Sequence, residues 1–306
     1  MSKRSKRLNA FPEIPDDVRN WLRKIFSECN DAVSSQVSRI PTIQETYLDM
    51  TFVSQVSKYA APFKMASNWV VQVETHYLGG MRHFMERWEI ADIGILMLFR
   101  KRGKIIRAKT VLLQSKRLYP DEQEWDEATM VDYGVGFARL AKSDHEAAKL
   151  LESRAFNFGA ESRYKALVVE DEQYIAIQNY EATNSTPVFY LLYNPMALPW
   201  TRVLPADSDL PVGLRTEVGC RVVASRALRQ SLRDKPALYK PTYKDILLSK
   251  KSELVGYRLE EFIVDRVLAC HDGHAADNFD DNGIRGVFYR RSGPIAAALA
   301  ITIDAP

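Results

Sequence analysis

Residues 90–117 read IADIGILMLFRKRGKIIRAKTVLLQSKR and form the most regular stretch of the chain. Its first ten residues, Ile90 to Phe99, are almost wholly apolar, which indicates a strand buried on both faces. The next five residues, Arg100 to Lys104, are basic apart from Gly103 and supply a turn. Ile105 to Ser115 is rich in β-branched and aliphatic residues, which favours a second strand. The stretch therefore predicts a long β-hairpin.

Three polar residues of the hairpin are candidate catalytic residues: Asp92, Gln114 and Lys116. Gln114 and Lys116 are two positions apart, so on a strand their side chains leave the same face. A three-residue loop at Arg102-Gly103-Lys104 would set Asp92 directly opposite Gln114, and directly opposed residues project to one side. We therefore expect a carboxylate, an amide oxygen and an ammonium group to lie together.

This set of groups suits hydrolysis of a phosphodiester bond. A hard divalent cation such as Mg²⁺ (or Mn²⁺) takes oxygen ligands, which Asp92 and Gln114 can supply. Such a cation would polarise the phosphoryl oxygen and lower the pKa of a bound water. Lys116 would orient that water or stabilise the charge that develops in the transition state. A purely structural ion pair between Asp92 and Lys116 is the alternative interpretation.

Asp92, the hairpin and Gln114-Ser115-Lys116 together resemble the PD-(D/E)XK motif of the restriction-endonuclease-like nucleases, in the variant with glutamine at the acidic position. The residues around Asp92 and Lys116 are similar to those of glutamine-variant nucleases in bacterial anti-phage defence. The resemblance covers about residues 40–195. It implies a restriction-endonuclease-like core in which Asp92 and Gln114 bind metal and Lys116 serves the attacking water. Ala91 stands where the motif has proline, and Gln114 is neutral, so the implied metal site carries less charge.

Nucleases of this kind commonly have a helix with an early glutamate before the hairpin, and Glu45 occupies that place. The resemblance therefore implies that Glu45 is a further catalytic and metal-binding residue. Thr42-Ile43-Gln44-Glu45 also has the form of a capping box, in which a glutamate at the third helical position returns to the capping threonine. The two roles need not exclude each other.

Helices and strands alternate loosely along the rest of the chain, which predicts an α/β fold with a mixed central β-sheet flanked by helices. Helices are expected over 15–38, 42–59, 132–153, 171–180, 225–233 and 259–269. Strands are expected over 69–73, 187–193, 220–224 and 295–303, and a loop over 199–216. We expect a basic arm and N-terminal helix over 1–40, a nuclease core over 41–200, and a C-terminal α/β extension packed on the core over 201–306.

Composition excludes several classes of protein. A hydrophobic content of 46% and a charged content of 26% are those of a globular chain. No apolar run reaches the roughly 18 residues that a membrane span needs, and no Gly-rich phosphate loop of the GxxxxGK form is present. The three cysteines have no CxxC spacing and are expected as reduced thiols, which places the protein in the cytoplasm.

The net charge of +3 does not by itself prove a nucleic-acid partner, but the basic residues are concentrated. Clustered cations bind phosphate backbones by releasing counterions. We expect the hairpin tip and the end of its second strand to contact nucleic acid, while a merely solvated turn is the alternative. The residues expected to make these contacts are Arg100, Lys101, Arg102, Lys104 and Arg117.

The sequence therefore predicts a Mg²⁺-dependent endodeoxyribonuclease. By analogy with the similar nucleases, we expect an effector of a bacterial anti-phage defence system that acts on DNA together with a partner ATPase, helicase or signalling enzyme. A catalytically silent nucleic-acid-binding or scaffold subunit is one rival, and a nuclease acting on RNA is another. The trigger, the sequence preference and the oligomeric state, including a homo-oligomer, are left open.

Overall fold

A computed structural model describes residues 13–77, 90–121, 154–184, 186–204, 216–248, 255–276, 282–288 and 295–306. The helices are α1 (Asp16–Arg39), α2 (Glu45–Ser57), α5 (Glu172–Asn184), α6 (Ser225–Ser231), α7 (Tyr243–Leu247), α8 (Leu259–Glu261), the π-helix η2 (Phe262–Leu268) and α9 (Asn282–Phe288). The strands are β1 (Phe63–Lys64), β2 (Val70–Tyr77), β3 (Ala91–Lys101), β4 (Lys104–Arg117), β5 (Arg154–Phe158), β6 (Val188–Tyr193), β7 (Trp200–Leu204), β8 (Arg221–Ala224), β9 (Tyr257–Arg258), β10 (His274–Ala276) and β11 (Ile295–Ala305).

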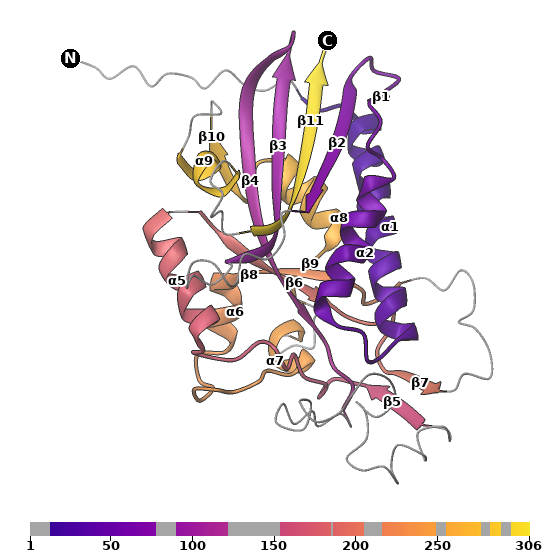
Figure 1. Cartoon of the computed structure of the whole chain (residues 1–306), viewed down its shortest axis with the longest axis vertical. Helices are drawn as coiled ribbons and strands as arrows, with labels where there is room; N and C mark the ends of the chain where they lie inside the picture. Colours follow the sequence, from indigo (N-terminus) through magenta and orange to yellow (C-terminus); the bar gives the residue numbers. More distant parts are fainter. Residues whose placement is uncertain are drawn as a thin grey trace.

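One mixed sheet organises these elements (Figure 1). Its strand order is β1-β2-β11-β3-β4-β6-β8-β9, and β10 pairs with β4 off this path. The pairs β11–β3 and β4–β6 are parallel, while the other pairs of this sheet are antiparallel. The predicted α/β class, with a mixed central sheet flanked by helices, is confirmed. The helix expected over 132–153 and the basic arm over 1–12 lie outside the described residues.

The β3–β4 hairpin has the expected register but reaches it differently. Its turn has two residues, Arg102 and Gly103, both with positive φ (52° and 73°), as a type I′ hairpin turn requires. A β-bulge then leaves Ile106 unpaired between the partners of Arg100 and Phe99. The extra residue compensates for the shorter turn. The ladder consequently runs to the pair Ile93↔Leu113, and the next position along β3 is Asp92, beside Gln114.

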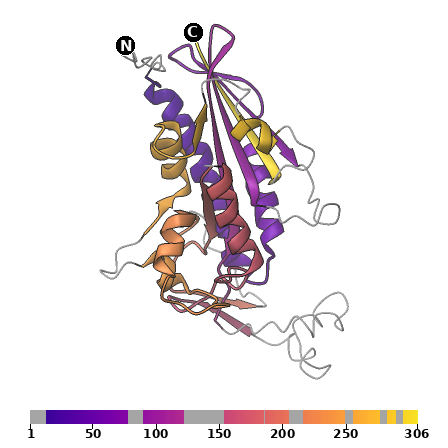
Figure 2. The ribbon, with the colours of Figure 1, turned by 90° about the vertical axis from the view of Figure 1, so that its left-hand side faces the viewer.

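The two faces of β3 pack against different helices, because successive side chains of a strand alternate between faces. Ile93, Ile95, Met97 and Phe99 belong to the large core that also contains the apolar faces of α1 and α2. Leu96 and Leu98 instead pack against Ile284 and Phe288 of α9 in a smaller core. Figure 2 shows α1 and α9 on opposite sides of the long strands. Successive residues of the hairpin are thus apolar because both of its faces are buried.

The C-terminal strand β11 lies inside the sheet, between β2 and β3. Its apolar residues Ile295, Leu299, Ile301 and Ile303 are buried there. Residues 201–306 also contribute β8, β9 and β10 to the same sheet. The expected boundary at residue 201 therefore does not separate two sheets. Within the expected loop over 199–216, β7 forms a two-stranded sheet with β5, and residues 205–215 lie outside the described residues.

None of the helices in the described ranges combines the length and the apolar character needed to cross a membrane.

Gly94 offers a test of the packing between β3 and α9. A Cβ atom at this position would lie 2.7 Å from Ile295 Cδ1 and 3.2 Å from Phe288 Cε1. We expect Gly94→Val to lower the free energy of unfolding by about 1–3 kcal/mol, because overpacked side chains must leave their rotamers. Gly286→Ala in α9 is the control, since its Cβ would meet no described atom within 4 Å. Urea unfolding that ranks Gly94→Val equal to wild type would contradict this packing.

Candidate active site

The β3 and β4 strands part at Asp92, and the carboxylate of Asp92 occupies the split. Pairing between β3 and β4 reaches Ile93↔Leu113, while β4 continues beside β6 as far as Arg117↔Tyr193. One oxygen of Asp92, Oδ2, accepts hydrogen bonds from the Ser115 backbone N–H and the Ser115 hydroxyl, both at 2.8 Å. The carboxylate therefore accepts a β4 N–H as a backbone carbonyl of a continued ladder would.

Gln114 contacts the same carboxylate oxygen. Its Nε2 donates to Asp92 Oδ2, so the two residues are in contact as expected, but through the amide nitrogen and not through the expected amide oxygen. The Gln114 side chain is only 1% exposed, and its Oε1 is buried with no hydrogen-bond partner among the described residues. A buried acceptor without a donor costs about 1–3 kcal/mol of stability. Gln114 thus carries an unused oxygen into the interior next to an anionic group.

Glu45 approaches β4 from the first turn of α2. The helix begins at Glu45 itself, with Gln44 as its N-cap and with no side-chain capping bond, so the predicted capping box is wrong. The cause is the position of the helix start, which places Glu45 first in the helix instead of third. Its Oε1 accepts the Arg117 backbone N–H at 3.0 Å, and its Oε2 lies 3.7 Å from Lys116 Nζ. Glu45 therefore binds the end of β4.

The ion pair between Lys116 and Glu45 is shielded from water. The Lys116 side chain is 6% exposed and the Glu45 side chain 20%. Because a buried ammonium group is costly without a partner, the ion pair with Glu45 offsets part of the free-energy cost of burying Lys116. The described contacts thus join Asp92 to Gln114 and Lys116 to Glu45, at neighbouring positions of β4.

Asp49 connects these two pairs and was not among the site residues predicted from the sequence. It lies one helical turn after Glu45, and its Oδ1 accepts the Tyr193 hydroxyl at 2.7 Å. Burial, followed by the negative charge of Asp92, raises the pKa of Asp49 well above its usual range, and Glu45 adds to this effect. The sequence contains a signal, since Asp49 lies at helical spacing before the core residues Phe52, Val53 and Val56.

The raised pKa of Asp49 has a consequence for stability. A carboxyl that binds its proton more tightly when folded stabilises the fold below its unfolded pKa of about 3.9. This contribution is lost as the pH rises through the folded pKa of Asp49. Burial and the negative charges of Asp92 and Glu45 thus oppose the ionisation of Asp49, and a bound cation would favour it.

The chemistry of these donors fits a hard divalent cation. Asp92, Glu45 and Asp49 supply carboxylate oxygens, and Gln114 supplies an amide oxygen that has no other partner. An amide presents its oxygen or its nitrogen after half a turn about its last torsion, so Gln114 can offer either atom to the Asp92 side. Among the described residues, no three His, Cys, Asp or Glu side chains already form a metal-ligand cluster. The fit therefore requires the Gln114 oxygen.

The basic residues at the hairpin tip lie far from this site. Lys101, Arg102 and Lys104 are exposed and Arg100 is half-buried. Lys101 is nine residues along β3 from Asp92, which separates the tip from the site by about 30 Å. Nucleic acid that touched both places would have to span roughly nine nucleotides along one strand. Figure 1 shows the tip at the end of the molecule opposite to β5 and β7.

Arg117 was expected to contact nucleic acid, and its surroundings correct this expectation. The side chain is 1% exposed, and burial lowers the pKa of its guanidinium to about 10. Its nitrogens donate to the backbone oxygens of Pro41 and Leu118, and its guanidinium carbon lies 4.0 Å from the centre of the Tyr119 ring. Arg117 therefore ties the end of β4 to the segment before α2 and does not face solvent.

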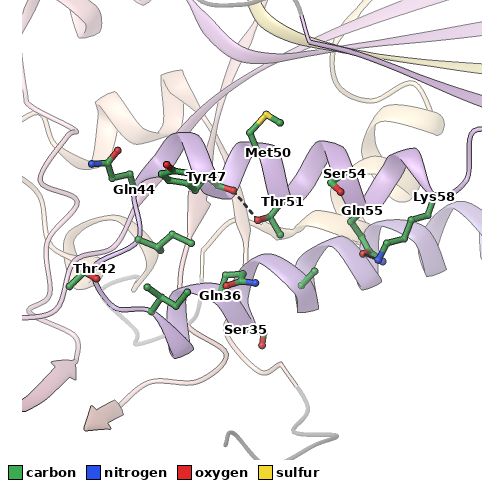
Figure 3. A pocket seen from close by; sticks show the side chains of 13 residues that line it. Ser35, Gln36, Thr42, Gln44, Tyr47, Met50, Thr51, Ser54, Gln55 and Lys58 are labelled. Atoms are coloured by element: carbon green, nitrogen blue, oxygen red, sulfur yellow. Dashed lines mark hydrogen bonds between the residues drawn. The ribbon is translucent and has the colours of Figure 1, made fainter. Parts of the chain in front are cut away.

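A separate hollow of about 970 Å³ lies along the outer side of α1 and α2 (Figure 3). Its lining includes Gln36, Gln44, Tyr47 and Met50, and its only charged residue is Lys58. A polyanion would find a single cation there. Glu45 and Asp49 are not among its lining residues, so this hollow is distinct from the acidic cluster.

Comparisons with models of protein families, with curated proteins and with solved structures find no match to this chain.

Gln114→Glu tests whether the site is built for a cation. The substitution places a second carboxylate against Asp92 where the structure has a hydrogen bond, so in EDTA at pH 8 we expect a lower melting temperature than wild type. Mn²⁺ should raise the melting temperature of this variant more than that of wild type, because a charged ligand binds the ion more tightly.

Gln114→Met is the matched control for this experiment. It removes the unpartnered oxygen and the Nε2 donor to Asp92 without adding charge, so the metal-free protein should melt below wild type while its response to Mn²⁺ is lost. Equal melting temperatures for Gln114→Glu and wild type in EDTA, with no response to Mn²⁺ in either protein, would contradict the cation site.

Proposed function

We propose that this protein is a divalent-metal-dependent nuclease that hydrolyses phosphodiester bonds of DNA. The observation that carries the proposal is the buried, unpartnered Oε1 of Gln114 beside the Asp92 carboxylate. A structural network would have satisfied this oxygen, since buried polar groups in folded proteins are almost always hydrogen-bonded. The ammonium of Lys116, two residues further along β4, would supply a positive charge to a bound phosphate.

Asp92, Gln114 and Glu45 would hold Mg²⁺ or Mn²⁺, with Asp49 as the additional carboxylate of the cluster. When bound, such a cation polarises a phosphoryl oxygen and lowers the pKa of water near it. The protein's own residues prepare the site for this chemistry. Ser115 fixes the Asp92 carboxylate through two hydrogen bonds, and Tyr193 fixes Asp49 through one. The acids are therefore oriented before any ligand binds.

Lys116 would orient the attacking water or stabilise the negative charge that develops on the phosphoryl oxygens. A lysine ammonium carries three donors, and the ion pair with Glu45 directs the group without consuming all of them. Because the side chain is nearly excluded from water, its interaction with a transition state is stronger than at an exposed position.

The biological setting is part of the proposal and rests on the resemblance in the residues around Asp92 and Lys116. Glutamine-variant nucleases with similar residues act in bacterial anti-phage defence. We propose that this protein is such an effector in the cytoplasm, working with an ATPase, a helicase or a signalling enzyme. Phage plating on bacteria that express the protein with its neighbouring genes, beside the same strain carrying Lys116→Ala, tests this part separately.

Lys116→Ala tests the proposed function directly. In Mg²⁺ we expect the wild type to nick supercoiled plasmid and EDTA to abolish nicking. The variant should lose about 10²–10³-fold in rate, the usual effect of removing one charge-stabilising contact from a transition state. Lys64→Ala, which removes an exposed lysine of β1 that has no part in the proposed site, is the control and should cleave like wild type.

Parallel reactions with duplex DNA, single-stranded DNA and RNA define the substrate. Faster cleavage of RNA would replace DNA as the substrate while keeping the site. Full activity of a folded Lys116→Ala protein would remove this lysine from the mechanism. Binding without cleavage of any substrate in Mg²⁺ or Mn²⁺ would show a catalytically silent nucleic-acid-binding subunit instead.

A further inference from the structure

Three segments that are distant in the sequence lie side by side just beyond the end of β4. Tyr119 forms an antiparallel bridge with Arg163, and Arg163 forms a second one with Thr242, at the N-cap of α7. The Tyr119 N–H also donates to the Arg163 carbonyl at 3.0 Å. Figure 1 shows α7 well away from the hairpin tip. These three segments form a surface around Tyr119, Arg163 and Thr242. This surface begins directly after the strand that carries Gln114 and Lys116.

Cationic side chains lie near tyrosine rings on this surface. The Arg163 side chain is exposed, its guanidinium lies 5.5 Å from the centre of the Tyr239 ring, and its Nη1 donates to the Lys240 carbonyl at 2.7 Å. Lys165 Nζ lies 5.6 Å from the centre of the Tyr119 ring, and Lys240 is exposed. Contacts with aromatic faces restrain these long side chains, which reduces the entropy lost when they bind an anion.

The acidic residues on the same segments are engaged locally. Glu161 pairs with Lys244 at 3.2 Å, and Asp245 pairs with Lys235 at 2.7 Å. Asp121 accepts the Ser162 hydroxyl. Because Glu161 and Asp245 are each matched by their own lysine, the exposed cations Arg163 and Lys240 outweigh the charge of Asp121 and give the described part of this surface a positive balance.

The surface is also close to the proposed active site. Tyr119 is three residues after Lys116, which corresponds to about 10 Å along an extended chain, or roughly three nucleotides of one strand. The charge of Glu45 contributes to the raised pKa of Tyr119, after burial and against the effect of Arg117. The hairpin tip, in contrast, is about 30 Å from Asp92.

We propose that Arg163 and Lys240 bind the sugar–phosphate backbone of the nucleic acid that is cleaved at Asp92, and that this surface, not the hairpin tip, makes the principal phosphate contacts. This inference rests on the proposed function. The rings of Tyr119 and Tyr239 are already in contact with cations, so they restrain side chains and do not stack on bases. Binding should therefore be independent of base sequence and strongly dependent on salt.

Two matched double variants separate the two surfaces. Arg163→Ser with Lys240→Ser, and Lys101→Ser with Arg102→Ser, each remove one arginine and one lysine that are exposed. Fluorescence anisotropy with a labelled 20-base-pair duplex, at several NaCl concentrations, measures the association constant K and the slope of log K against log salt concentration. EDTA is present throughout, so that the duplex is not cleaved. We expect the first variant to flatten the slope by about two and to lower K at 0.1 M NaCl on the order of 10- to 100-fold. The second should change both quantities less.

Arg163→Lys with Lys240→Arg preserves the charges and should bind like wild type, which separates loss of phosphate contacts from damage to the fold. A wild-type slope for the folded Arg163→Ser, Lys240→Ser protein would overturn the inference, and so would a larger loss for the tip variant. Because these measurements exclude metal, a protein that binds through this surface but never cleaves would overturn the proposed function alone.

Discussion

The hydrogen bonds that Asp92 accepts at the point where β3 and β4 part hold the candidate site together. Two donors from Ser115 and one from Gln114 converge on a single carboxylate oxygen. This arrangement ends the β3–β4 ladder and leaves β4 paired with β6. Polar side chains can therefore enter an otherwise apolar sheet. Without an anion at this position, the Ser115 N–H and the Gln114 amide would lack their acceptor, and unpaired buried donors are costly.

Helix α2 completes the site by bringing acidic residues to the same place. Glu45 and Asp49 are one turn apart, so they face the sheet together. Glu45 stabilises the buried ammonium of Lys116, and Asp49 is held by Tyr193 from β6. Burial, followed by the charges of Asp92 and Glu45, raises the pKa of Asp49. A divalent cation bound beside these side chains would offset both effects and favour the ionised carboxylate.

The hairpin could be predicted from sequence because its apolar residues, its turn and its polar residues all indicate one structure. The contact between Asp92 and Gln114 followed from that pattern, although the turn is one residue shorter and Ile106 forms a bulge. Compensating irregularities of this kind leave no separate signal in the sequence. The central position of β11 could not be predicted either, because strand order depends on long-range packing.

The errors at the site have local physical causes. The sequence around Thr42 fits a capping box, but α2 begins at Glu45, whose carboxylate binds the Arg117 N–H and Lys116 instead. Arg117 follows the strand in a basic run, yet its guanidinium satisfies the Pro41 carbonyl inside the protein. A charge count along the sequence does not distinguish such a buried cation from an exposed one such as Arg163.

A crystal structure of the protein grown with Mn²⁺ would show whether a cation binds beside Asp92, because anomalous scattering locates manganese independently of the protein atoms. We expect a peak bound by Asp92, Glu45 and the Oε1 atom of Gln114, with the amide turned from the hydrogen bond that it donates to Asp92 in the metal-free arrangement. Density with Gln114 Nε2 still donating to Asp92, and with no anomalous peak beside these side chains at saturating Mn²⁺, would contradict the account.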